Sequence, residues 1–138
     1  MQLEVRINLI LHATENENKV LEKLENIFGI EQKKFQIEEI PGHFNNPILL
    51  ISSKLKKKTA ENFLRVFFSK MKKTDFQEIF DNVEDYVISS GLSLRVSKQK
   101  LISEVLTISK EDAIKININT PVYVKNETKK IYQELMNI

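Results

Sequence analysis

The chain has 138 residues, of which 41% are apolar and 29% are charged. This length suits one domain, and the composition excludes a disordered, collagen-like or mucin-like chain. The absence of cysteine excludes a disulfide framework, a thiolate metal site and a cysteine nucleophile. A net charge of +2 favours no class of partner. We therefore expect a single globular domain over residues 1–138.

The N-terminal segment carries polar residues at alternating positions, namely Glu4, Arg6 and Asn8. A secretory signal would instead be continuously apolar and would follow positive charge. The longest purely apolar run, residues 48–51, is far shorter than the roughly 20 residues that span a bilayer. Together with the absence of cysteine, these patterns predict a soluble cytoplasmic protein that does not contact a membrane.

A strand followed by a helix is predicted at the start of the chain. Apolar residues alternate with polar ones over 5–11, which is typical of a half-buried strand. Apolar residues at helical spacing follow over 20–28. Thr14 and Glu17 have the spacing of an N-terminal capping box, and Gly29 stands where a left-handed cap would end the helix.

A β-hairpin and a second helix are predicted next. Residues 35–40 and 47–55 have strand patterns. Residues 41–46 between them favour a turn, because they begin with Pro-Gly and contain three residues that tolerate turn conformations. Apolar side chains then recur on one face over 59–72, which indicates a helix.

The second half of the chain predicts one more helix, three strands and a final helix. Thr74 and Gln77 form another capping-box pattern, which predicts a helix that extends to about Ile88. The remaining elements are expected over 92–96, 102–108, 114–118 and from about Asn126 onward. The resulting order is β-α-β-β-α-α-β-β-β-α. It is typical of an α+β two-layer sandwich, with a mostly antiparallel or mixed sheet and helices on one face.

Motifs for catalysis are sparse. The three glycines lie at separate turns, so the chain has no glycine-rich phosphate loop. His12 and His43 have no partner at metal-ligand spacing, and a strand-end histidine bonded to the backbone is the favoured interpretation of His12. Acids at 81, 84 and 85 fit a solvated helix face better than a cation site. We expect no enzyme activity, no metal, no cofactor and no small-molecule substrate.

Positive charge is concentrated in the middle of the chain. Residues 33–73 hold ten bases and three acids, whereas residues 1–32 hold three bases and six acids and residues 74–138 hold eight bases and ten acids. Such a cluster can neutralise RNA phosphates, although lysines also complement helix C-termini and protect strand edges from aggregation. The candidate phosphate contacts in this cluster are Lys54, Lys56, Lys57, Lys58 and Arg65.

Aromatic residues bear on whether RNA bases are recognised. Readers of single-stranded RNA usually stack bases on exposed aromatic side chains. Five of the eight phenylalanines lie on apolar helix faces and are expected in the core. Phe35, Phe44 and Tyr123 remain as candidate stackers. The sequence therefore favours contact with the RNA backbone or with its shape over base recognition.

Four stretches spread over the chain carry further motifs: His12-Ala13-Thr14-Glu15, Gly42 to Ile48, Leu94 to Gln99, and Asp112-Ala113-Ile114. Together they resemble the archaeal RNA-binding family described as predicted exosome subunits. The members of that family are similar in fold to the large-subunit ribosomal protein that binds 5S ribosomal RNA. The resemblance implies association with RNA and with exosome proteins.

The chain departs from the family pattern at two positions. Asn45 stands where the family hairpin usually has its second glycine, and Ser97 stands where the family favours aspartate. Because asparagine tolerates a left-handed conformation, the turn can survive the first change. Within the matching stretches we expect Lys98 to contact phosphate and His43 and Arg95 to orient the RNA. For His43, a structural role in its turn is the favoured interpretation and the contact with RNA is the alternative.

Two hypotheses of function follow. The leading one is a non-catalytic RNA-binding protein that assists RNA processing or degradation in association with the exosome. The alternative is a structural or interaction protein that forms a homodimer, or docks on a larger complex, without binding RNA.

Overall fold

The computed structural model describes residues 2–12, 15–42 and 46–138. Six strands form one antiparallel sheet in the order β2-β3-β1-β6-β5-β4. The strands are β1 (Glu4–His12), β2 (Gln36–Pro41), β3 (Pro47–Lys56), β4 (Val87–Ile88), β5 (Gly91–Ser97) and β6 (Ala113–Asn119).

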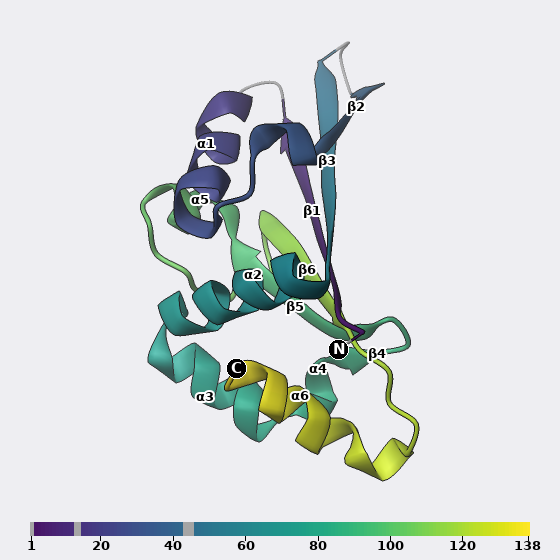
Figure 1. Ribbon diagram of the computed structural model, residues 1–138. Helices are drawn as coiled ribbons and strands as arrows, with labels where there is room; N and C mark the ends of the chain where they lie inside the picture. The colour runs from purple at the N-terminus through teal and green to yellow at the C-terminus, as the bar shows by residue number, and fades with distance from the viewer. Residues whose placement is uncertain (1, 13–14, 43–45) are drawn as a thin grey trace.

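Six α-helices and two 3-10 turns complete the described part of the chain. The helices lie on one side of the sheet (Figure 1), which confirms the predicted α+β class. We call that side of the sheet the covered face and the other the open face. The elements are α1 (Glu17–Phe28), η1 (Gln32–Lys34), α2 (Lys57–Lys70), α3 (Lys73–Asp81), α4 (Val83–Tyr86), α5 (Lys98–Ile102), η3 (Lys125–Glu127) and α6 (Thr128–Met136).

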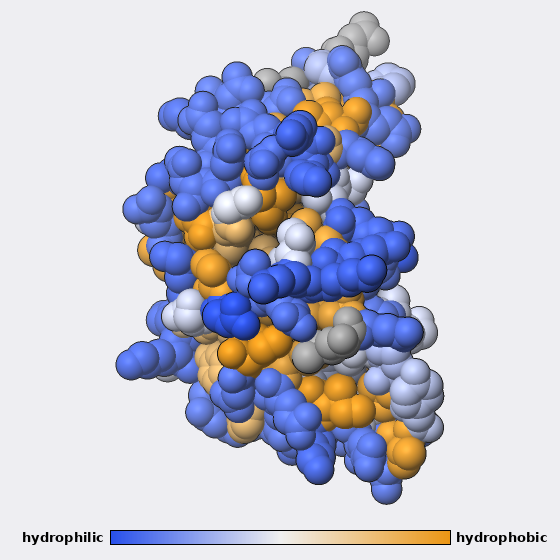
Figure 2. All heavy atoms as spheres, viewed as in Figure 1, coloured by the Kyte–Doolittle hydropathy of each residue, from blue (hydrophilic) through white to orange (hydrophobic). Residues whose placement is uncertain are grey.

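Strand alternation divides the two faces. In β1, every second residue from Val5 to Leu11 is buried, and the residues between them are exposed or half-buried. The buried set packs with Phe63 and Phe67 of α2, whose rings stack at a centroid distance of 5.4 Å. Each fully buried side chain of this size contributes about 1.5–3 kcal/mol by leaving water. The core therefore lies between the covered face and the helices. On its outer side, α1 carries mostly hydrophilic residues (Figure 2).

The start of α1 differs from the prediction, whereas its end agrees with it. Thr14 lies outside the described residues, and Glu17 is the first helical residue. The N-cap is Asn16, whose side chain accepts a hydrogen bond from the Lys19 backbone N–H at 3.2 Å. Gly29 ends the helix with φ of 72° and donates its N–H to the Glu25 carbonyl at 2.8 Å, as predicted.

The predicted hairpin is confirmed by the β2–β3 ladder, which runs from Gln36–Ser52 to Pro41–Pro47. Gly42 closes its end by donating its N–H to the Asn46 carbonyl at 2.8 Å. A side chain at Gly42 would collide with that same carbonyl oxygen, so this position requires glycine. The residues between them, His43, Phe44 and Asn45, lie outside the described part of the chain.

The strand predicted over 102–108 is wrong. The segment instead begins with the short helix α5 and continues as an irregular connection to β6. Ser97 starts this helix by accepting the Lys100 N–H at 3.1 Å, and it therefore performs as an N-cap, a role that aspartate also performs. The segment meets the edge of β5 that faces away from β6 at one place only, where the Ser97 N–H donates to the Thr107 carbonyl and the Ser109 N–H donates to the Arg95 carbonyl, each at 2.9 Å. Of the predicted strand, isolated bridges remain at Leu106 and Ile108.

The region after α2 also differs from the prediction. α3 begins at Lys73 with no side-chain cap, so the proposed Thr74–Gln77 capping box does not form. The helical segment is interrupted at Asn82 and ends at Tyr86, and the next two residues form β4. The sheet reaches six strands because β4 replaces the strand predicted over 102–108. No helix in the described ranges is long and apolar enough to cross a membrane.

Candidate nucleic-acid interface

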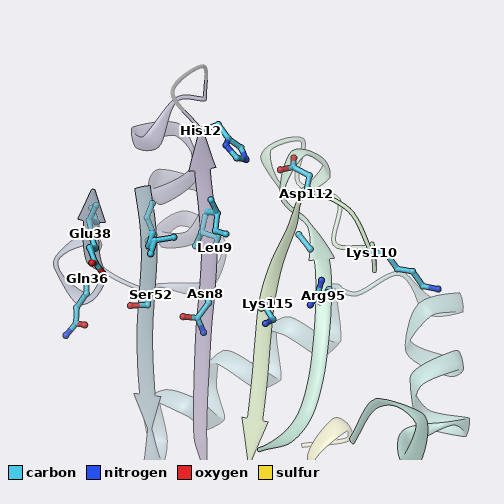
Figure 3. Close-up of a pocket in the computed structure, with 15 residues that line it drawn as sticks. Asn8, Leu9, His12, Gln36, Glu38, Ser52, Arg95, Lys110, Asp112 and Lys115 are labelled. Carbon is cyan, nitrogen blue, oxygen red and sulfur yellow. The ribbon is translucent and has the colours of Figure 1, made fainter. Parts of the chain in front are cut away.

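The open face carries a row of polar side chains that crosses five strands. The ladders pair Gln36 with Ser52, Ser52 with Asn8, Asn8 with Lys115, and Lys115 with Arg95. We call these five residues the polar row, and Figure 3 shows them side by side on β2, β3, β1, β6 and β5. Because neighbouring strands lie about 4.8 Å apart, the row spans roughly 19 Å.

A second row lies one ladder step further toward the end of the sheet near Glu4. It pairs Lys54 with Arg6, and Arg6 with Asn117. Lys54 and Arg6 share one carboxylate, with Glu4 Oε1 at 3.2 Å from Lys54 Nζ and Glu4 Oε2 at 3.6 Å from Arg6 Nη2. One negative charge therefore faces two positive charges, and the pair keeps a net positive charge.

Arg95 and Lys115 are the most informative pair on the open face. Both are exposed, and they stand directly opposite each other on β5 and β6. Neither makes an ion pair within the described residues, whereas Arg6 and Lys54 do. Like charges directly opposite on neighbouring strands destabilise a sheet. An anion bound between them would remove this repulsion.

The open face is hollowed beside this pair. A cavity of about 920 Å³ lies over the strands, and a second of about 460 Å³ lies next to it. Volumes of about 300–1,000 Å³ are typical of ligand sites. The larger hollow is lined by the whole polar row and by Ile10, Leu50, Glu38, Lys110 and Asp112. The smaller hollow adds Arg6, Lys34 and Lys54.

Lys98 does not belong to this surface, and its predicted contact with phosphate is corrected. Its side chain is 2% exposed. The ammonium donates to the Ile10 carbonyl at 2.6 Å and lies 2.8 Å from Glu15 Oε2 and 3.0 Å from Asp112 Oδ1. Glu15 in turn accepts the His12 backbone N–H at 2.9 Å. Lys98 therefore joins the end of β1, the start of α5 and the entry to β6.

The other predicted contacts fall in several places. Lys54 and Lys56 lie on the open face, where Lys56 is opposite Glu4. Lys57 and Lys58 form the first turn of α2, at the edge between the two layers. Arg65 lies on α2 in the helical layer, where its guanidinium donates to Asn62 Oδ1 at 3.2 Å. Arg95 shares the open face with Lys54 and Lys56, with β1 and β6 between its strand and theirs.

His43 lies outside the described residues, as does the candidate stacker Phe44. Phe35 is buried, which removes it from the candidate stackers. Tyr123 is 88% exposed, in the segment that joins β6 to η3.

Sequence reasoning missed the residues that complete the rows, chiefly Arg6, Asn8, Gln36, Ser52 and Lys115. Their alternation with apolar residues is visible in the sequence and places them on one side of each strand. The pairing of strands distant in sequence is not visible there, and only this pairing brings Lys115 next to Arg95.

Two tyrosines of the helical layer have raised pKa values. Burial raises the pKa of the Tyr132 hydroxyl on α6, and a backbone hydrogen bond at Thr120 opposes this. Burial also raises the pKa of Tyr86 on α4, with a further rise from the nearby Glu78 carboxylate. Across the ranges that the structure describes, no three acids or histidines are grouped to hold a metal ion.

A protein-family model described as RNA binding matches residues 4–120. The chain belongs to this RNA-binding family. RNA-binding protein PAB1135 from Pyrococcus abyssi is 32% identical over 126 residues, which cover 86% of this chain and 82% of that protein. The family resemblance expected from the four sequence stretches is thereby confirmed, while the exosome association and the likeness to a ribosomal protein stay predictions.

Solved structures agree with the fold. Protein SSO0741 from Sulfolobus solfataricus is 25% identical and superposes with a TM-score of 0.78, covering 97% of both chains. Mth689 from Methanothermobacter thermautotrophicus is 24% identical, with a TM-score of 0.73 and 99% of both chains covered. These proteins share the arrangement of sheet and helices with this chain.

Proposed function

We propose that this protein binds RNA through the open face of its sheet, with Arg95, Lys115, Arg6 and Lys54 contacting phosphates. The observation that carries the proposal is the Arg95–Lys115 pair, in which two exposed like charges face each other in register and neither forms an ion pair with an acid among the described residues. Phosphate oxygens accept hydrogen bonds from both side-chain types, and one phosphate can bridge them.

The family and the geometry support the same ligand. The family is described as RNA binding, and a relative bears that name. The four cations lie over neighbouring strands beside two hollows, so an extended polyanion can contact them at once. Neutralising several phosphates releases counterions, which makes the affinity for RNA depend on salt.

The experiment is a titration of fluorescent RNA against the protein at several salt concentrations. The variant Arg95→Ala/Lys115→Ala removes two phosphate contacts, so the slope of log affinity against log salt falls by about 1.4 for single-stranded RNA. A matched control is Lys129→Ala/Lys130→Ala, which removes two exposed charges from α6 in the helical layer. Equal slopes for the two double variants contradict the proposal.

We also propose that binding proceeds without a catalytic step and that the protein assists RNA processing or degradation together with exosome proteins. The support for the partner is the family resemblance of the four sequence stretches. RNA should be recovered intact after incubation with the protein, as judged on a denaturing gel. Retention of purified archaeal exosome on the immobilised protein, with and without RNA, tests the association.

A further inference from the structure

The larger hollow contains more than phosphate-binding groups. Three residues of the polar row, Asn8, Gln36 and Ser52, present amide and hydroxyl groups from three adjacent strands. Phosphate oxygens only accept hydrogen bonds, so lysine and arginine serve them best. An amide offers a donor and an acceptor together, which is the pattern that matches the edge of a nucleobase.

The amides of this hollow are available to a ligand. Within the ranges that the structure describes, the side chains of Asn8 and Gln36 make no hydrogen bond to another residue, whereas the neighbouring Asn117 side chain donates to Ser90 Oγ at 3.0 Å. The Ser52 side chain stands between them in the row. The two amides thus flank a hydroxyl across three strands, in a hollow large enough for a nucleoside.

Apolar side chains adjoin the amides at the next ladder step. Ile10 is 48% exposed on the open face and stands opposite Leu50, which is half-buried. Both line the same hollow. The other large apolar residues of β1 are buried on the covered face, whereas Ile37 of β2, which also lines the hollow, is 45% exposed. A flat apolar ligand such as a base plane would cover this exposed pair.

The charged side chains around the larger hollow predict the orientation of a nucleotide bound in it. Arg95 and Lys115 are on the β5–β6 side of the hollow, whereas Glu38 is on the β2 side and repels phosphate. Asp112 also lines the hollow, and its Oδ1 lies 3.0 Å from the Lys98 ammonium, which offsets part of its charge because Glu15 shares the same ammonium. Lys110 adds a further positive charge near the β6 end. A nucleotide therefore fits with its phosphate over β5 and β6 and its base toward β1, β3 and β2.

We infer that the larger hollow seats an unstacked nucleobase of single-stranded RNA, held by Asn8, Gln36 and Ser52 against Ile10 and Leu50, with the adjoining phosphate on Arg95 and Lys115. This inference rests on the proposed RNA-binding function and deepens it. A double helix does not fit the same chemistry, because its bases are stacked and paired, and its deep major groove excludes short side chains from a sheet.

The experiment compares three RNA probes by fluorescence anisotropy at one salt concentration. The first is a single-stranded 12-mer of mixed sequence, the second is the same 12-mer with abasic ribose at its six central positions, and the third is a 12-base-pair duplex. The complete single strand should bind about tenfold more tightly than the abasic strand, because only its bases can make the hydrogen bonds and apolar contacts of the hollow. It should also bind more tightly than the duplex.

The variant Asn8→Ala/Gln36→Ala assigns the effect to the hollow. It should weaken binding of the complete strand about tenfold, leave binding of the abasic strand unchanged and leave the salt slope unchanged. The control Asn18→Ala/Asn26→Ala removes two exposed amides of α1 and should change none of these. Circular dichroism and thermal unfolding confirm that each variant is folded.

The outcomes separate the two proposals. Equal binding of the complete and abasic strands, or tighter binding of the duplex, overturns the nucleobase site while the RNA-binding function stands. An equal loss for both single strands in the Asn8→Ala/Gln36→Ala variant overturns it as well. Failure of all three probes to bind at low salt overturns the RNA-binding function, and the nucleobase site with it.

Discussion

The two faces of the sheet are built from the same strands and differ in what explains their residues. On the covered face, Val5, Ile7 and their neighbours are buried under α2, and folding alone accounts for them. On the open face, Arg95 and Lys115 repel each other and Ile10 is exposed, so folding does not account for them. Residues that oppose stability in a folded chain indicate a ligand.

The covered face should set the stability of the protein. Phe67 is fully buried and lies between Phe63 and Phe68 in the ring cluster of α2. Phe67→Ala should lower the free energy of unfolding by about 3–5 kcal/mol, through lost burial and the cavity it leaves. Urea denaturation measures this change. A loss below about 1 kcal/mol would show that the core does not rest on this cluster.

Lys98 contributes to stability next to the open face, because its buried ammonium binds groups at one end of the larger hollow. Lys98→Met keeps the apolar volume but leaves the Ile10 carbonyl and two carboxylates without the ammonium. Since Glu15 and Asp112 are partly exposed, the loss of unfolding free energy should be about 2–3 kcal/mol, below the range for a fully buried pair.

The salt slope of RNA binding separates this structural role from the phosphate contact expected from the sequence. A buried ammonium does not release counterions from RNA, so Lys98→Met should leave the slope unchanged. Glu15→Gln is a matched comparison, because it weakens the same cluster without altering an exposed cation. A slope that falls by about 0.7 with Lys98→Met would restore the phosphate contact.

We expect the like charges of the open face to favour RNA binding and to lower the free energy of unfolding. Lys115→Glu turns the like-charged pair with Arg95 into an opposite-charged pair, which should raise the free energy of unfolding by about 0.5 kcal/mol. The same change should weaken RNA binding at least tenfold, since it replaces an attraction for phosphate with a repulsion. Parallel urea and anisotropy titrations test both parts. A variant that is less stable, or that binds RNA equally well, would break the contrast between the faces.

The smallest effect is expected at the start of α2. Lys57 and Lys58 lie at the edge between the layers, not in the rows of the open face. Lys57→Ala/Lys58→Ala should therefore change the salt slope by less than Arg95→Ala/Lys115→Ala, whose expected change is about 1.4. Arg65→Ala serves as the control within the helical layer. If Lys57→Ala/Lys58→Ala changes the slope more than Arg95→Ala/Lys115→Ala does, the RNA interface includes the edge of the sheet at the start of α2.

The sequence predicts much of the fold because its strongest patterns are local. The alternation in β1, the end of α1 at Gly29 and the hairpin closed at Gly42 each depend on residues close in the chain. The strand predicted over 102–108 failed because its apolar residues also suit a short helix followed by an irregular connection. Short apolar runs do not distinguish these forms. Contacts with distant residues decide between them, such as the Asp75 carboxylate, which accepts the Ile108 N–H at 3.1 Å.

The sequence by itself determined the α+β class, the polar and apolar sides of each strand, and the family to which the chain belongs. Those features rest on the side-chain period of each element, which neighbouring residues set. Only the tertiary structure placed Lys115 beside Arg95, buried Lys98 among Ile10, Glu15 and Asp112, and gathered Asn8, Gln36 and Ser52 around one hollow. Strand register and burial arise from contacts between distant segments, so the site they build has no local pattern in the sequence.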